Sequence, residues 1–492
     1  MKNKRREGMI APFVAVSFLL VASLVLLLLE GTRLGYAEAV CMQQARYAAQ
    51  SFMGQYHVNL FKQFGVYGVD EHLYEEKERI LTDMGQFRTG KQGGSFLNPI
   101  SHDTEEFSYR LLTDDGGLDF RKQAIQDYLY RLPEGALAKL NSQLSVAAIL
   151  GDQDDERAII NQAEGALKEA EEILKEEKNN KNSHNIAGFP AIGTDSGLEF
   201  LGGRKKQEKA ENPIEIMKKQ KQSFTLSMVL PENFNLSMAT RIKNQGLEDK
   251  EPVIGTMEAE DDVISGERLI FPLYIRDDFF NALTEHSSDE TGNGLQYQME
   301  YVLIGKDSDA KNLEGVVQRL ILIREMSWFA YRLTDGTSLP YARSIATALA
   351  GGLGLPALIE PIAMGIVLAW SYTDGVNDVK ELLKGNEVML MPGAQNINRP
   401  GVPGNIKVGY RDYLTMLIAM ENMDKATLRT LDMVEEVLQV EDPDFSANRV
   451  ITGIEGCIKY EYEELFFGWI TVVRRDLFPI EFQSKYRECY CE

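Results

Sequence analysis

Carboxylates are the side chains of this sequence best suited to catalysis. The chain carries 74 Asp and Glu residues. The adjacent Asp277 and Asp278, or Glu300 on an expected strand, could serve as general acid and base if their surroundings separated their pKa values. With so many acidic residues, such pairs also arise by chance. A surface hydrolase is therefore only an alternative hypothesis for this chain.

The common catalytic and cofactor-binding signatures are absent from the sequence. It lacks the G-x-x-x-x-G-K-[ST] phosphate loop, the G-x-G-x-x-G fingerprint, the H-E-x-x-H zinc motif and the G-x-S-x-G elbow. The histidines are scattered and have no ligand-like neighbours at helical spacing; they are His57, His72, His102, His184 and His286. We therefore predict no catalytic residues, no cofactor, no metal site and no enzymatic activity.

Composition narrows the classes of partner. The 492 residues allow two to four domains, and 52 Lys and Arg against 74 Asp and Glu give a formal net charge of −22. Such a chain repels nucleic-acid phosphates, so we expect no nucleic-acid partner.

The cysteines Cys41, Cys457, Cys489 and Cys491 are too few for a disulfide framework. Outside the cytoplasm Cys457 could pair with Cys489 or Cys491, and free thiols fit equally well.

An apolar segment near the N-terminus predicts a transmembrane helix over residues 9–30. The 21 residues Met9 to Leu29 carry no formal charge, and a helix of that length spans about 31 Å, the thickness of a hydrocarbon core. The expected lipid contacts include Met9, Phe13, Phe18, Leu24 and Leu29. A cleaved signal peptide ending at the A-x-A sequence of residues 37–39 is the alternative.

The basic tail, residues 1–8, predicts the orientation. Lys2, Lys4, Arg5 and Arg6 precede the apolar segment, so the positive-inside rule places the N-terminus in the cytoplasm. We expect a single-pass protein of the cell membrane whose acidic remainder is extracytoplasmic.

A second apolar stretch lies near residues 345–371. It is interrupted by Gly351, Gly352, Pro356 and the Glu360-Pro361 pair. A carboxylate at bilayer depth is costly, and prolines break long helices. We expect a buried helical hairpin here, with a second membrane pass as the alternative.

The residues between the anchor and position 212 are expected to be mainly helical. The three- and four-residue spacing of apolar residues predicts that the membrane helix continues to about Lys62 and ends at Gly65 and Gly68. Residues 85–117 should form a loop with short ordered pieces, and residues 119–131 a helix. Pro133 should begin another helix, and residues 154–178 a charged one. We assign 31–178 to a helical stalk and N-terminal ectodomain, and 179–212 to a linker or mobile insertion.

Residues 213–492 are predicted to form an α+β ectodomain. Apolar and polar residues alternate over 295–301 and 458–463, which is typical of half-buried strands. Residues 312–331 and 425–440 have the period of amphipathic helices. The predicted fold class is therefore α+β, with a long N-terminal helix, a helical middle region and a mixed C-terminal domain.

Six sequence blocks carry a resemblance to a known type of protein. They are LLEGTR at 28–33, QY at 55–56 with FGVYGVD at 64–70, NPIE at 212–215, YQMEYVLIGK at 297–306 with Asp309 and Asn312-Leu313, residues 352–360 with Ala369-Trp370, and YRDYL at 410–414. In this order they resemble an uncharacterised Gram-positive family of membrane-anchored, pseudopilin-like proteins, similar to those of tight-adherence (Tad) pilus systems. The motif residues are Glu30, Arg33, Tyr56, Gly65, Gly68, Tyr297, Glu300, Tyr301, Gly305, Lys306, Asp309, Asn312 and Trp370.

The resemblance implies a non-catalytic, envelope-anchored accessory or assembly component of a pilus or secretion apparatus. The lipid bilayer and the proteins of that apparatus would be its partners. Prepilin processing resembles cleavage after a glycine with glutamate at the fifth residue beyond it, but Phe13 stands at that distance from Gly8. We therefore expect retained anchoring. An extracytoplasmic binding module for a wall polymer or an extracellular protein remains an alternative.

One face of the long helix suggests how such a component could make contacts. Ala45, Ala48, Ala49 and Phe52 form a stripe of mostly small residues beyond the membrane. The stripe fits packing against a partner's helix and packing against the chain's own ectodomain equally well, because a helix stripe shows only that something covers it.

Overall fold

The computed structural model groups the chain into two compact units that interleave along the sequence. Unit 1 comprises Met1–Tyr130, Leu247–Ser265 and Val434–Glu492, and unit 2 comprises Arg131–Gly246 and Gly266–Met433. The residues described are 10–70, 101–132, 160–161, 164–165, 168, 172, 213–224, 226–241, 246–250, 253–257, 266–284, 294–353, 355–392, 406–462 and 480–490. The boundaries expected at 178 and 212, the linker between them and the helix expected from Pro133 lie outside these residues.

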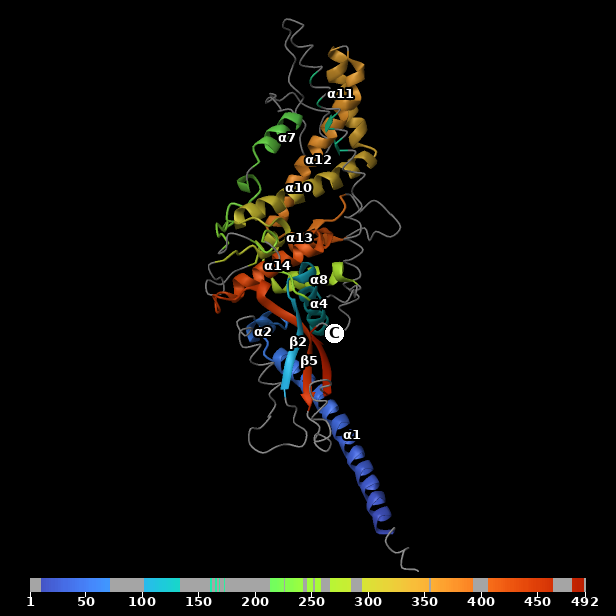
Figure 1. The fold of residues 1–492 in the computed structure, drawn as a ribbon. Coiled ribbons are helices and arrows are strands. Elements are labelled where there is room, and N and C mark those ends of the chain that lie inside the picture. The colour runs from blue at the N-terminus through green and yellow to red at the C-terminus, as the bar shows by residue number, and fades with distance from the viewer. Residues whose placement is uncertain are drawn as a thin grey trace, which may run out of the picture. The chain divides into compact units, whose positions relative to one another are not determined.

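A four-stranded antiparallel sheet forms the centre of unit 1 (Figure 1). Its central strand, β5 (Val450–Tyr462), pairs with β2 (Ser101–Leu111) on one edge, from Ser101 opposite Glu461 to Leu111 opposite Ile451. The other edge of β5 pairs with β1 (Val69–Asp70) and β6 (Ile480–Cys489), the latter from Tyr462 opposite Ile480 to Cys489 opposite Gly453. The sheet therefore unites segments from both ends of the chain.

The strand β2 corrects one expectation, and β5 confirms another. We expected only short ordered pieces in a loop over 85–117, but residues 101–111 form the 11-residue strand β2. The sequence SHDTEEFSYRL is too polar to show the alternation of a half-buried strand, and pairing with β5 supplies the missing stabilisation. The strand expected over 458–463 is confirmed through Tyr462, as the last part of β5.

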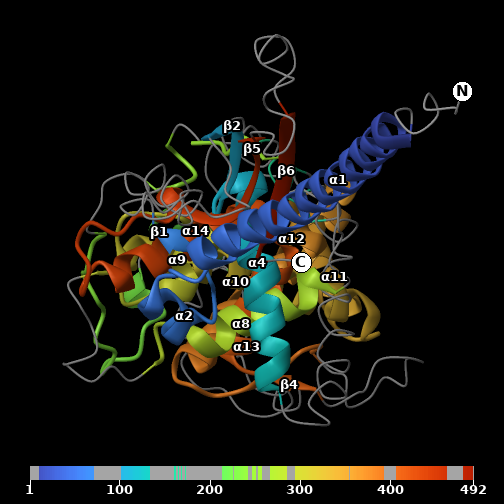
Figure 2. The same cartoon turned by 60° about the horizontal axis from the view of Figure 1, so that its bottom comes forward.

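The long N-terminal helix, α1 (Ile10–Met53), runs beside β6 (Figure 2). The prediction that it continues to Lys62 is wrong, because the helix ends at Met53 and a short turn precedes α2 (Val58–Phe64). The side chain of His57 accepts a hydrogen bond from the backbone N–H of Leu60 and caps α2. Gly65, which was expected to end the long helix, instead ends α2, with a left-handed φ of 69°.

The remaining helices of unit 1 lie close to the expected positions. The helix predicted over 119–131 is the regular part of α4 (Asp114–Arg131), whose residues 115–117 are not helical. The short 3₁₀ helix η5 (Ala447–Arg449) leads into β5. Most of the charged helix expected at 154–178 lies outside the described residues, and the six residues described there are helical.

Unit 2 is built almost entirely of helices. They are α7 (Pro213–Gln222), α8 (Glu267–Asp278), α9 (Gln298–Ile304), α10 (Asp309–Thr334), α11 (Ser338–Leu353), α12 (Ile359–Leu383), α13 (Tyr410–Met420) and α14 (Met423–Leu438), whose last residues belong to unit 1. Two short 3₁₀ helices, η2 (Leu226–Met228) and η3 (Pro356–Leu358), and the strand pair β3 (Val388–Met389) and β4 (Lys407–Val408) complete the described part.

The structure confirms the helices predicted at 312–331 and 425–440 as parts of α10 and α14. It contradicts the strand predicted at 295–301, where residues 298–304 form α9. Tyr297, Glu300 and Tyr301 also have helical spacing, and Gly305, with φ 74°, ends α9 in the left-handed conformation. The described residues are mostly helical and contain a four-stranded sheet and a two-stranded one, which is compatible with the α+β class.

The hairpin expected near 345–371 is formed by α11 and α12, with the turn at Pro356. α12 packs against α10 and α7, and its residues Ile362, Ala363 and Ile366–Ala369 are buried. Two helices in the described part of the chain, α1 and the segment Pro356–Leu383, are long and apolar enough to cross a membrane. More than half of the second one is buried inside the protein.

Candidate functional site

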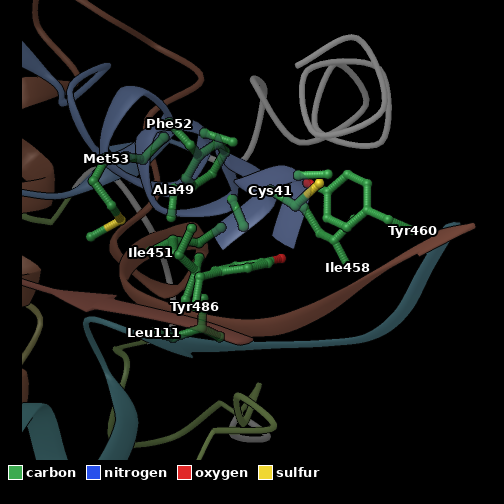
Figure 3. Close-up of a cluster of buried hydrophobic side chains, with 14 residues drawn as sticks. Cys41, Ala49, Phe52, Met53, Leu111, Ile451, Ile458, Tyr460 and Tyr486 are labelled. Atoms are coloured by element: carbon green, nitrogen blue, oxygen red, sulfur yellow. The ribbon is translucent and has the colours of Figure 1, made fainter. Parts of the chain in front are cut away.

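A strip of mostly small side chains docks α1 onto the sheet of unit 1 (Figure 3). The buried residues recur every third or fourth position of the helix; they are Ala37, Cys41, Ala45, Ala48, Ala49, Phe52 and Met53. The sheet side supplies larger residues: Val69, Leu111, Ile451, Ile454, Ile458, Tyr460 and Tyr486. Alanine and cysteine are short, so the helix backbone approaches the strands closely and the strand side chains fill the space between. We call these α1 residues the docking strip.

The docking strip answers the question that the sequence left open about Ala45, Ala48, Ala49 and Phe52. Each is at most 2% exposed and lies in one cluster with residues of the chain's own strands. The intramolecular alternative is therefore confirmed, and this face is not free to pack against a partner's helix. Within the segment 31–178, assigned to a helical stalk and N-terminal ectodomain, the helix packs on the sheet from Ala37 onward.

Polar contacts fix the direction of α1 along β6. The hydroxyl of Tyr490 donates to the carbonyl oxygen of Met53. One turn earlier, Gln50 Nε2 donates to Glu488 Oε1 at 3.1 Å. Further toward the N-terminus, Cys41 lies beside Tyr460, which pairs with Phe482. The apolar part of α1 and the beginning of β6 therefore lie toward the same end of unit 1.

The docking cluster contains two phenols without a hydrogen-bond partner. Burial raises the pKa of Tyr486 to about 12 and raises the pKa of Tyr460 further. Among the residues that the structure describes, neither hydroxyl has a hydrogen-bond partner. A buried polar group left unpaired costs about 1–3 kcal/mol. The apolar contacts of the cluster must offset that cost.

The motif residues Glu30 and Arg33 form an ion pair where the apolar part of α1 ends. Arg33 Nη2 lies 2.6 Å from Glu30 Oε1, and the two side chains are 2% and 7% exposed respectively. Leu29, immediately before them, is 46% exposed. Burial of two opposite charges requires such pairing, because an isolated charge out of water is very costly.

The expected lipid contacts lie on the exposed surface of α1. Phe13, Phe18, Leu24 and Leu29 are all exposed, whereas Met9, Lys2, Lys4, Arg5 and Arg6 lie outside the described residues. The helix is apolar enough to be a membrane anchor or a signal sequence.

Three motif residues shape the chain that follows α1. The Tyr56 ring meets Phe61 and Tyr67 edge-on, with centroids 5.7 and 5.0 Å away. A Cβ at Gly65 would lie 2.1 Å from Asp127 Cγ, and one at Gly68 would lie 2.2 Å from Val450 Cγ1. These positions therefore require glycine for close packing, and no chemistry is evident from them.

In unit 2 the motif residues around α9 make a network of buried polar contacts. Asp309, at the start of α10, accepts hydrogen bonds from the backbone N–H of Tyr297 at 3.0 Å and from Ser237 Oγ at 2.5 Å. The hydroxyl of Tyr297 accepts from the N–H of Ser237 at 2.8 Å and donates to the carbonyl of Asn235 at 3.3 Å. Asp309 therefore fixes the approach of two chain segments to the beginning of α10.

Glu300 is a fully buried carboxyl group of this network, and its pKa is strongly raised. It is 0% exposed, and burial raises its pKa to about 7. Its Oε1 accepts from Tyr410 Oη at 2.8 Å and from the N–H of Ala282 at 2.9 Å, whereas Oε2 has no hydrogen-bond partner. Because Glu300 is fully buried, no substrate atom reaches it in this conformation.

Tyr301 joins the network through two charged partners. Its hydroxyl donates to Asp432 Oδ2 at 2.8 Å and accepts from Arg241 Nη1 at 2.7 Å. Arg241 Nη2 also lies 3.2 Å from Asp432 Oδ1. Burial, followed by the charge of Asp432, raises the pKa of Tyr301. The phenol therefore remains a donor to the carboxylate.

The last motif residues of this block hold the turn between α9 and α10. A Cβ at Gly305 would lie 2.7 Å from the side chain of Arg429, which donates to the carbonyl of Leu303. Asn312 accepts from the N–H of Lys306 at 2.8 Å and donates to its carbonyl at 2.9 Å. The motif therefore has a structural role in the described residues.

Trp370 lies in an aromatic stack on α10, α11 and α12. The guanidinium of Arg332 is 5.7 Å from its ring centroid and 5.6 Å from that of Trp328, while Tyr341 stacks on Trp370 at 6.0 Å. Arg332 also pairs with Asp374 of α12. The stack connects the hairpin to α10.

Arg324 is an important buried residue that the sequence analysis did not identify. Its side chain, 1% exposed, donates twice to Asp378 Oδ2 at 2.5 and 2.8 Å and also to Leu390 O and Tyr413 Oη. The available signal was an arginine among apolar residues of an amphipathic helix, a position that requires a buried acceptor.

The acidic pair proposed for catalysis is bound to arginines. Asp277 pairs with Arg276 at 2.9 Å, and Asp278 pairs with Arg131 at 2.5 Å. Among the residues that the structure describes, no group of three or more His, Cys, Asp or Glu is placed to hold a metal ion. Among the described cysteines, Cys41 and Cys457 are buried and Cys489 is partly buried, and Cys491 lies outside the described part.

Comparisons with known proteins give one match. No curated protein and no solved structure matches the chain. The model of a family of unknown function, DUF5702, matches residues 203–462, which include the α9 network, Arg324 and the α11–α12 hairpin. Since this match covers more than half of the sequence, the chain belongs to the DUF5702 family of unknown function.

Proposed function

We propose that this protein is a non-catalytic, membrane-anchored component that supports the assembly of a tight-adherence-like pilus or secretion apparatus. The proposed topology is a single pass, with a cytoplasmic N-terminus and an extracytoplasmic remainder. The observation that carries the proposal is the continuity of α1. A single helix leads from exposed apolar residues to the docking strip. An anchor of this kind fixes the position and orientation of a folded unit relative to the bilayer.

Two further observations support an assembly role. The motif residues around α9 are used for internal hydrogen bonds and ion pairs, which is expected of residues that maintain a fold. The link to a pilus or secretion apparatus is carried by the resemblance of the sequence blocks. Neither argument depends on a catalytic group.

Anchoring is tested by replacing residues 9–30 with a cleavable secretion signal in the native host. The altered protein should appear in the medium, whereas the unaltered protein should stay in the membrane fraction after carbonate extraction. Unchanged membrane fractionation of the altered protein would contradict the anchor. Intact mass and N-terminal sequencing provide the second measurement. A native N-terminus at Val40 would identify α1 as the source of a cleaved signal sequence.

The assembly role is tested by complementation. Deletion of the gene should abolish surface pili or secretion, and the full chain should restore them. The secreted form that lacks residues 9–30 should not. Normal pili and secretion in the deletion strain would exclude the proposed role.

A further inference from the structure

We propose that unit 1 rests directly on the lipid headgroups, with the end of the sheet at Tyr462 and Ile480 facing the bilayer surface. We call this the membrane-side end of the sheet. The inference rests on the proposed anchoring of α1 and adds the position of the folded unit relative to the bilayer. It predicts that no free helical stalk separates the two.

The first argument is the abrupt fall in side-chain exposure along α1, just after its apolar segment. Leu28 and Leu29 are 61% and 46% exposed, but Glu30 is 5% and Arg33 is 4% exposed. The buried face then continues to Ala37 and the rest of the docking strip. Protein therefore covers one side of the helix from the first residue after the apolar segment. A free stalk would leave its charged residues exposed to water.

The second argument is the direction of the strands. Met53 contacts Tyr490, Gln50 contacts Glu488, and Cys41 lies beside Tyr460, which pairs with Phe482. Lower residue numbers in α1 thus correspond to lower residue numbers in β6. The first residue of β6, Ile480, is consequently the part of that strand that is closest to the apolar segment.

The third argument is the short distance between the membrane-side end of the sheet and the hydrocarbon core. From Cys41 back to Leu29 the helix covers ~18 Å at 1.5 Å per residue. The two strand residues from Phe482 to Ile480 cover up to ~7 Å of this, which leaves at least ~11 Å between the sheet end and the hydrocarbon core. The headgroup layer itself is roughly 5–7 Å thick. About 4–6 Å then remain, which is too short for a free helical stalk. Residues 463–479, which join the two strands at this end, lie outside the described residues.

The test places a single nitroxide label on the full-length protein in phosphatidylcholine vesicles that contain a gadolinium-chelating lipid. The labels replace Glu481 near the membrane-side end, Arg487 six residues further along β6, or Leu24 in the apolar segment. Cys489→Ser and Cys491→Ser form the background, and the buried Cys41 and Cys457 are retained. Relaxation by the lipid-bound gadolinium should be several-fold stronger at position 481 than at position 487.

A spacer variant provides the matched control. Seven alanines inserted after Leu29 add two helical turns and move the unit outward by about 10 Å, with almost no change in rotation. The relaxation at position 481 should then fall several-fold. If the labelled Glu481 variant does not fold, as judged by circular dichroism, the exposed Gln483 replaces it.

The outcomes separate this inference from the proposed anchoring. Equal and weak relaxation at positions 481 and 487, or no response to the spacer, would overturn the inference. In that case a label at Leu24 that is accessible to oxygen but not to water-soluble quenchers would still support the anchor. A Leu24 label that water-soluble quenchers reach would overturn both.

Discussion

The docking strip of unit 1 and the α9 network of unit 2 hold their helices by opposite means. The docking strip relies on apolar contacts between small helix residues and large strand residues. The α9 network relies on directional contacts, such as Asp309 with Ser237 and Tyr301 with Asp432. Apolar contact depends on shape and volume, whereas a buried polar contact fails when one partner is lost. The two regions should therefore respond to different substitutions.

The largest effect is expected for Arg324→Leu in the polar region. The substitution leaves Asp378, Leu390 O and Tyr413 without their buried donor. Loss of one partner of a buried ion pair costs about 3–5 kcal/mol. Chemical denaturation in detergent should show this decrease. Arg319→Leu on the same helix is the control, because its pair with Glu421 is partly exposed to solvent and worth at most about 1 kcal/mol. Equal effects would contradict the assigned role of Arg324.

The second effect is a dependence of stability on pH that Glu300 creates. Its pKa is raised from 4.5 to about 7 in the folded state, so the folded chain binds the proton more tightly than the unfolded chain. The contribution of Glu300 to stability is full below pH 4.5 and is lost as the pH rises through about 7, by about 3 kcal/mol in total.

This pH effect is measured as the difference in unfolding free energy between the wild type and Glu300→Gln. The difference should decrease from pH 4.5 to pH 8, because the amide cannot ionise. The neighbouring Asp309 is retained in both proteins. Glu387→Gln, at an exposed site, serves as the control and should not alter the slope. A constant difference for Glu300→Gln would show that Glu300 does not titrate in this range.

The third effect concerns volume in the docking strip. Ala49 is 0% exposed, and Ala49→Leu would force a larger side chain between α1 and the sheet. We expect a loss of about 1–3 kcal/mol. Ala39→Leu makes the same change on the exposed side of the helix and should stay within about 0.5 kcal/mol of the wild type. If both variants behave alike, α1 is not docked as described.

The smallest expected changes in stability come from replacing one tyrosine in each region by phenylalanine. Tyr460→Phe removes a buried hydroxyl without a hydrogen-bond partner and should raise stability by about 1 kcal/mol. Tyr297→Phe removes a hydroxyl that is bonded to Ser237 and Asn235 and should lower stability by a similar amount. Thermal unfolding measures both, and shifts of the same sign would remove the distinction between the regions.

Local patterns predicted the long helices and a helix end at Gly65, because their signals lie within short stretches of sequence. The apolar period of α10 and the left-handed Gly65 are examples. The same reasoning failed for α9, where all residues from Gln298 to Leu303 are buried. A fully buried segment has no polar face, so its period cannot distinguish a helix from a strand.

The candidate sites were only partly predictable, because their partners lie far apart in the sequence. Glu300 and Tyr301 were identified by resemblance, but their partners Tyr410 and Asp432 are more than 100 residues away. The docking strip was identified as a covered face, while the covering strands β5 and β6 belong to the last 45 residues. Pairing at such separations depends on the complete fold.

The position of β5 at the centre of the sheet has a consequence for biosynthesis. α1 leaves the ribosome almost 400 residues before Val450 is added. At about 5–20 residues per second, the docking strip waits on the order of 20–80 s for the strands that cover it. During this time its alanines and Phe52 are accessible for binding by other proteins. A chaperone or a membrane-insertion factor that shields residues 37–53 would therefore act on the nascent chain, before unit 1 exists.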